Sequence, residues 1–164
     1  MKYYDNEVIY SVALDLGYDI DTIRKAADQK SSGFMYSMVK TSNTLPLFDQ
    51  VYITQSKVIR HLASQESCII VNGVADYILE DFSEVISVFI HAPMNSRIKR
   101  VKDVYKEDHE NIEKYIVSKD KRRSHYYTTK KWGQLKNFDL TINSDLGIEE
   151  VADIIVDVFK NSYE

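Results

Sequence analysis

Three short apolar runs, set far apart along the 164 residues, constrain the fold more than any other feature. They span residues 68–71, 85–90 and 138–142, and β-branched or aromatic side chains dominate them. Short runs of this kind are typical of strands buried on both faces. Helical patterns separate the runs, and strands that alternate with helices favour a parallel sheet. The sequence therefore predicts an α/β fold.

The predicted helices rest on apolar residues at helical spacing. Asp5 is expected to cap a first helix that ends at Gly17, and a short second helix is expected over 21–30. The stretch from there to Pro46 is predicted to be irregular. Longer amphipathic patterns follow at Leu47, Val51, Val58, Ile59 and Leu62; at Met94, Ile98, Val101 and Tyr105; at Ile112, Tyr115 and Ile116; and at Ile148, Val151, Ala152, Ile155, Val158 and Phe159.

Length and composition indicate one domain over residues 1–164, since 44% of the residues are hydrophobic. No apolar stretch approaches the length of a membrane span, and residues 2–6 do not resemble a signal sequence. Cys68, the only cysteine, lies in the first apolar run and is expected to act as a small buried hydrophobe. These features predict a cytoplasmic protein that does not bind a membrane.

The charge is unevenly distributed. Residues 97–131 hold 12 Lys and Arg against 6 Asp and Glu, so the rest of the chain holds 21 − 12 = 9 against 25 − 6 = 19. Such a basic segment suggests an anionic ligand, either nucleotide phosphates or a nucleic-acid backbone. A solvated helix face is the alternative explanation.

The site is expected where predicted strands end. Asn72 follows one predicted strand and His91 follows another, and ligands of open α/β sheets bind beyond the carboxyl ends of strands. No metal-ligand set is predicted.

Arginines follow this point along the chain. Arg97 and Arg100 stand three residues apart, so on a helix they would share a face and could clamp phosphate oxygens. Asp120 stands one helical turn before Arg123, and a carboxylate can hold an arginine in position for a phosphoryl group. Since phosphoryl transfer depends mostly on positioning and charge neutralisation, this inventory suits a kinase lid over about residues 97–131.

The order of several motifs resembles the cytidylate-kinase-like family over nearly the whole chain. The motifs are KYYDNEVI at 2–9, QSKVIR at 55–60, IIVNGVADYIL at 69–79, VFIHAP at 88–93, RIKRV at 97–101, DKRR at 120–123, YY at 126–127, WG at 132–133, DL at 139–140, NS at 143–144 and LGIE at 146–149.

The resemblance implies a three-layer P-loop kinase fold, in which helices flank a parallel sheet. It also implies transfer of the γ-phosphate of ATP, with Mg²⁺, to a nucleoside monophosphate such as CMP. Carried over by position, the implied catalytic residues are Asp120, Arg122 and Arg123, with Asp120 orienting an arginine; Arg97, Arg100 and Ser144 belong to the ATP side; and Asp5 and Asp76 face the acceptor nucleotide.

The sequence also departs from this family. No glycine begins a G-x-x-x-x-G-K-[ST] pattern, so the main ATP-phosphate site is predicted to be missing together with the strand that precedes it. In the family that strand lies mid-sheet, so a gap or a re-pairing of strands is expected. Val74 stands where the family usually has an arginine for the acceptor phosphate. A truncated gene product, or a start codon assigned too far downstream, is the expected explanation.

Three hypotheses stay open. The first is a nucleoside monophosphate kinase, and the second is a catalytically silent nucleotide-binding or interaction domain of the same fold. The third is nucleic-acid binding through 97–131, which predicts steep salt dependence. A homo-oligomer is compatible with each of them.

Overall fold

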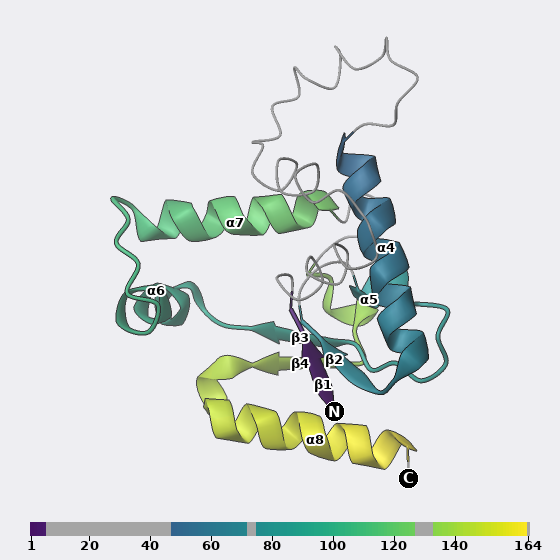
Figure 1. Cartoon of the computed structure of the whole chain (residues 1–164). Coiled ribbons are helices and arrows are strands. Elements are labelled where there is room, and N and C mark those ends of the chain that lie inside the picture. The colour runs from purple at the N-terminus through teal and green to yellow at the C-terminus, as the bar shows by residue number, and fades with distance from the viewer. Residues whose placement is uncertain (6–46, 72–74, 127–132, 164) are drawn as a thin grey trace. The chain divides into compact units, whose positions relative to one another are not determined.

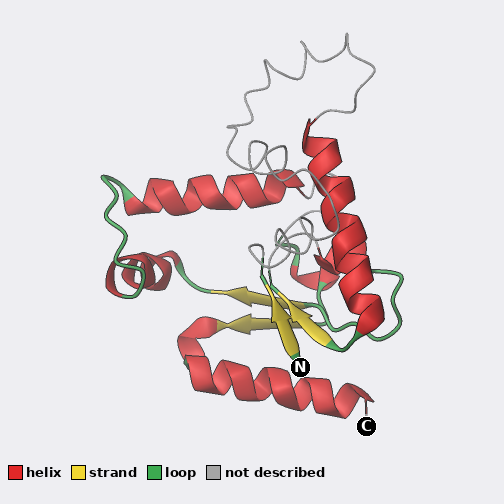
Figure 2. Cartoon of the chain, in the orientation of Figure 1, coloured by secondary structure: helices red, strands yellow, loops and turns green. Residues whose placement is uncertain are grey.

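A computed structural model describes residues 1–5, 47–71, 75–126 and 133–163; for 47–51, 122, 125 and 126 it describes the backbone alone (Figure 1). The chain divides into two compact units, Met1–Phe82 and Ser83–Glu164. Each unit contains both helices and strands, as Figure 2 shows, so the predicted α/β class is confirmed. The predictions for 6–46, including the first two helices, lie outside the described residues.

The first unit contains a parallel strand pair. Strand β1 (Lys2–Tyr4) pairs with β2 (Cys68–Ile70), so that Tyr3 stands opposite Ile69. The ladder extends by one further bond, since the amide of Val71 donates to the carbonyl of Tyr4 at 2.8 Å. The chain start therefore supplies a strand beside β2.

Helices α4 (Leu47–Gln65) and α5 (Ala75–Ile78) flank β2 along the chain. Val58, Ile59 and Leu62 lie on one face of α4 because they are one and four residues apart, and all three are buried. This confirms the predicted helix and, over the described side chains, its apolar face; the side chains of Leu47 and Val51 lie outside the described residues.

Two polar contacts fasten this unit. Glu66, just before β2, accepts a hydrogen bond from the Tyr4 hydroxyl at 2.9 Å. It also forms an ion pair with Lys2 at 2.7 Å. Arg60 of α4 donates two hydrogen bonds to Asp81, at 3.0 and 2.9 Å. The first contact joins the starts of β1 and β2, and the second joins α4 to the turn that follows α5.

The second unit contains the other parallel strand pair. Strand β3 (Val88–His91) pairs with β4 (Leu140–Asn143), from Val88 opposite Leu140 to His91 opposite Asn143. Helices α6 (Met94–Asp103) and α7 (Ile112–Tyr126) come between these strands along the chain. A 3₁₀ turn, η2 (Leu135–Asn137), precedes β4; a second, η3 (Ser144–Leu146), and helix α8 (Ile148–Tyr163) follow it.

Asp139 joins the starts of β3 and β4. Its carboxylate accepts hydrogen bonds from the Ser87 amide at 2.8 Å and from the Ser87 hydroxyl at 2.7 Å. The three long helices predicted for this unit and both strands are confirmed. Three large side chains at predicted apolar positions are exposed: Tyr105, which lies beyond the end of α6, and Ile148 and Phe159 of α8.

The expected burial of the strands on both faces is wrong. Ile69 of β2 is 50% exposed, and Ile90 of β3 is 53% exposed. The reason is that the described strands form two separate two-stranded sheets, and so narrow a sheet does not bury both of its faces. Cys68 is only half-buried, although burial still raises the pKa of its thiol.

Candidate functional site

Helices α6 and α7, which carry most of the basic segment, pack on one another through a small apolar core. Val101, Ile112 and Ile116 are buried there, and Met94, Ile98 and Tyr115 pack around them. These residues recur at intervals of three and four along each helix, so they form one apolar face on each. We call helices α6 and α7, with residues 104–111 between them, the α6–α7 pair.

A bidentate ion pair joins the two helices. Arg97 of α6 donates from Nη1 to Oδ2 of Asp120 at 2.7 Å, and from Nη2 to Oδ1 at 2.8 Å. The flat guanidinium matches the two carboxylate oxygens, which makes this the strong form of the contact. The hydrogen bonds that Arg97 donates to Asp120, more than the charge of Asp120, raise the pKa of Arg97, against the lowering effect of burial.

This contact changes the expected pairing of the arginines. The spacing predicted that Asp120 would hold Arg123 and that Arg97 would act together with Arg100. The structure instead brings Asp120 to Arg97, 23 residues away along the chain. Both terminal nitrogens of Arg97 are therefore engaged inside the protein.

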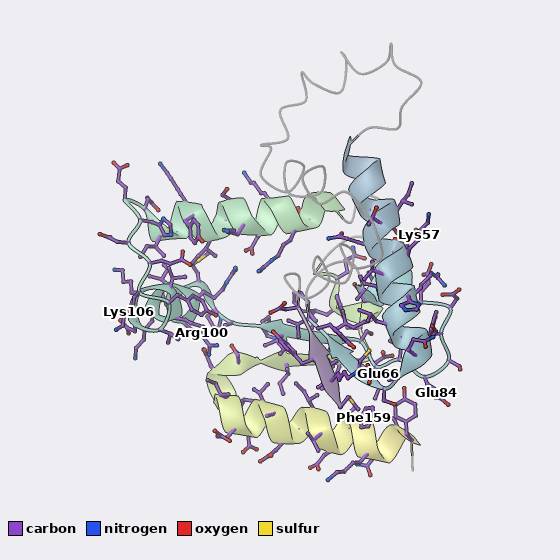
Figure 3. All side chains as sticks on the ribbon, in the orientation of Figure 1. Lys57, Glu66, Glu84, Arg100, Lys106 and Phe159 are labelled. Carbon is purple, nitrogen blue, oxygen red and sulfur yellow. The ribbon has the colours of Figure 1, made fainter. Side chains whose placement is uncertain are left out.

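The other arginines of the predicted site lie on either side of this ion pair along the chain. Arg100, labelled in Figure 3, is half-buried on α6 between Arg97 and the connection to α7. Arg123 is exposed on α7, beyond Asp120. Within the described part of the chain, neither side chain has an ion pair or hydrogen bond. Arg122 also belongs to α7, but its side chain lies outside the described residues.

The connection between α6 and α7 has its own polar and aromatic cluster. Nε2 of His109 lies 2.7 Å from a carboxylate oxygen of Glu107, and the His109 ring stacks on Tyr115 with centroids 3.7 Å apart. Lys119 places its ammonium 5.2 Å from the Tyr115 ring. Hydrogen bonds from His109 and then from Tyr115 lower the pKa of Glu107. Sequence reasoning missed this cluster, because no local motif joins its members.

Polar residues also lie at the carboxyl ends of β3 and β4, the kind of position where ligands of open α/β sheets bind. The side-chain oxygen of Asn143 accepts a hydrogen bond from the Asp145 amide at 3.0 Å, and the Ser96 hydroxyl donates to Asp145 at 2.9 Å. Ser144, expected on the ATP side, opens the 3₁₀ turn between these partners. Ser96 and Asp145 were not singled out from the sequence, although Ser96 lies in the first turn after Pro93.

The predicted acceptor residues lie in the other unit. Asp5 directly follows β1 and accepts a hydrogen bond from the Tyr3 hydroxyl at 3.3 Å. Asp76 lies in the first turn of α5, shortly after the end of β2. Asn72 and Val74, which come between, lie outside the described residues. The predicted acceptor residues thus belong to the first unit and the arginines to the second.

Two further tests concern metals and membranes. Where the structure describes the chain, it contains no group of three or more His, Cys, Asp or Glu side chains that could hold a metal ion. Over the same residues, every helix is too short or too polar to cross a bilayer.

The chain is similar to one known protein family and to one solved structure. The model of the cytidylate kinase-like family matches residues 1–146 of the chain. An uncharacterized protein from Eubacterium ventriosum ATCC 27560, known from a crystal structure, is similar with a TM-score of 0.69 and 21% identity, over 98% of this chain and 84% of that one. At this identity, the likeness shows a shared fold alone. The curated proteins gave no significant match.

Proposed function

Since the chain belongs to the cytidylate kinase-like family, we propose that it acts on a nucleoside monophosphate and transfers a phosphoryl group from ATP to CMP or a similar nucleotide. The proposal includes a P-loop kinase-like sheet in one domain, a lid at about residues 97–131, and a cytoplasmic location. One observation carries it. The α6–α7 pair commits Arg97 to Asp120, while Arg100 and Arg123 have no partner among the described side chains.

The arginines of α7 hold the central role in this proposal. Arg123, exposed one turn beyond Asp120, and Arg122 beside it would neutralise the phosphoryl group during transfer. An arginine placed in this way contributes about 10³ to 10⁵ in rate in phosphoryl-transfer enzymes. Arg100 and Ser144 would contact the donor nucleotide, and Asp5 and Asp76 the acceptor.

The residues present fit a phosphate group better than they fit a complete ATP–Mg²⁺ complex. Guanidinium groups match phosphate oxygens, but the sequence contains no glycine-rich loop whose amides could cradle a triphosphate. The described residues also hold no acidic cluster for a metal.

The lack of a glycine-rich loop in this sequence favours a second candidate, a nucleotide-binding domain of this fold that transfers no phosphoryl group. Val74 supports this candidate too, because valine cannot donate a hydrogen bond to an acceptor phosphate.

A radiolabel assay separates the candidates. The 164-residue chain would be incubated with γ-labelled ATP, Mg²⁺ and CMP, while CMP binding is measured by calorimetry. Labelled CDP supports the kinase. CMP binding without label transfer supports the second candidate, and the absence of both overturns the proposal.

Arg123→Ala tests the assigned role if transfer occurs. Turnover should fall about 10³-fold or more, against a loss of CMP affinity of only about tenfold, because the arginine acts mainly on the group in flight. Lys114→Ala is the matched control, since it removes a positive charge from an exposed position of the same helix. Equal turnover in the two variants would remove Arg123 from the mechanism.

A further inference from the structure

We propose that Arg97 and Asp120 are positioning residues: their contact fixes the far part of α7 to α6 and so holds Arg123 in place, and Arg97 itself does not bind phosphate. This inference rests on the proposed function for its nucleotide, although the contact itself can be tested without one. It reassigns Arg97, which the family resemblance places on the ATP side.

The exposure pattern along α7 carries the inference. Ile112, Tyr115 and Ile116 pack against α6 near the connection, but the side chains that follow are exposed at Val117, Ser118, Lys119, Lys121, Arg123 and Ser124. Asp120 is the one described side chain of that stretch that is not exposed. Its bonds to Arg97 are therefore the contact that keeps this part of α7 against α6.

The contact lies on the side of the buried residues that faces away from the connection. Arg97 stands four residues before the buried Val101, and Asp120 stands four residues after the buried Ile116, so each lies one helical turn from a buried residue. At the other end, His109 stacks on Tyr115. Because Arg123 follows Asp120 by three residues, this contact is the nearest fastening to it.

The state of Arg97 argues against a role as phosphate ligand. Its two terminal nitrogens already hold a carboxylate in the geometry that a phosphate would take. The two side chains are only 31% and 23% exposed. An incoming anion would have to displace a tethered, half-buried partner, whereas the exposed Arg123 faces no such competition.

Substitution of Asp120 distinguishes two roles for this residue: it holds α7 in position, or it covers a phosphate-binding site on Arg97. If Asp120 positions α7, Asp120→Asn weakens CMP binding, because the amide cannot accept both guanidinium bonds. If Asp120 instead covers a phosphate site on Arg97, the same substitution strengthens CMP binding by freeing the arginine. The two roles thus predict changes of opposite sign.

The test combines hydrogen exchange of the free chain with CMP titration. We expect Asp120→Asn to speed amide exchange over residues 117–124 by about fivefold to tenfold, and to weaken CMP binding by a similar factor. Arg97→Lys keeps the charge but loses the two guanidinium nitrogens that together bond Asp120, so it should give a smaller effect of the same sign. Glu113→Gln is the control, since it neutralises an exposed carboxylate in the first turn of the same helix. The exchanged pair, Arg97→Asp with Asp120→Arg, should recover much of the protection.

Several outcomes decide the matter. Unchanged exchange over 117–124 in Asp120→Asn, or tighter CMP binding by that variant, overturns the positioning role. Faster exchange together with weaker CMP binding supports it. If the wild-type chain binds no CMP, the proposed function fails, while faster exchange in the variant still supports the contact between Arg97 and Asp120.

Discussion

The two units of the chain contain the same chemical pair at different exposure. In the first unit Arg60 makes two hydrogen bonds to Asp81, and in the second Arg97 makes two to Asp120. The side chains of the first pair are 44% and 60% exposed, against 31% and 23% for the second. From their hydrogen-bond geometry alone, the two pairs would be expected to contribute equally to stability.

The surroundings explain why they differ. The Arg60 side chain is partly exposed, with its guanidinium 5.6 Å from the Phe82 ring, and an exposed pair gains little because water and salt screen it. Arg97 and Asp120 are less hydrated, so removal of one partner leaves the other with a charge that water solvates only in part. We therefore expect burial and location, more than bond length, to decide how much an ion pair contributes to stability.

The largest effects should come from the apolar cores beside these pairs. Ile116→Ala in α7 and Ile59→Ala in α4 should each lower the free energy of unfolding by about 2–5 kcal/mol, measured by urea denaturation followed by circular dichroism. Both side chains are buried. Only Ile116→Ala should also speed native-state hydrogen exchange in α7, because Ile116 belongs to the α6–α7 core.

That difference can break the comparison. If Ile59→Ala speeds exchange in α7 as much as Ile116→Ala does, the two cores act as one cooperative structure. The separate treatment of the two ion pairs would then lose its basis.

A smaller effect is expected from the ion pairs themselves. Arg97→Ala should lower the free energy of unfolding by about 1 kcal/mol, a figure already reduced for solvent screening. Arg60→Ala should leave the urea midpoint nearly unchanged. A double-mutant cycle of each arginine with its aspartate measures the coupling directly, and an equal or larger coupling for Arg60 with Asp81 would contradict the role given to burial.

Much of the secondary structure could be predicted because its signal is local. Helices α4, α6, α7 and α8 follow from apolar periodicity, and β3 and β4 from compact apolar runs. Strand β1 could not be predicted in this way, since three residues are too few to show a period and its partner begins at Cys68. Strand burial was misjudged because it depends on how many strands lie together in a sheet.

The candidate site was predictable by region but not by contact. The end of β3 at His91 and the arginines of α6 and α7 were identified from the sequence, and Ser144 was identified from the family resemblance. The partner of Asp120 was not, because helical spacing offers only residues three or four away, such as Arg123. Arg97 reaches Asp120 through the packing of two helices, which no local pattern encodes.

The smallest effects concern the carboxylates that join the strand starts. The Ser87 amide, followed by its hydroxyl, lowers the pKa of Asp139, and hydrogen bonds from Lys2 and then Tyr4 lower the pKa of Glu66. A carboxyl group with a lowered folded-state pKa contributes stability above its unfolded pKa, about 3.9 for Asp and 4.3 for Glu, and loses it as the pH falls through the folded value. The urea concentration at the unfolding midpoint should therefore decrease as the pH is lowered below about 4. The decrease should be less steep in Asp139→Asn and in Glu66→Gln.

Salt should distinguish these two carboxylates. Glu66 is held in part by the ammonium of Lys2, a group exposed to solvent, so added salt should weaken its contribution. Asp139 is held by an amide and a hydroxyl, which carry no net charge to screen. At neutral pH, the stability lost in Glu66→Gln should therefore shrink from low salt to 1 M salt, where the screening length is about 3 Å, while the loss in Asp139→Asn should stay nearly constant. Equal salt dependence of the two losses would show that the charge of Lys2 does not contribute to the contact in the first unit.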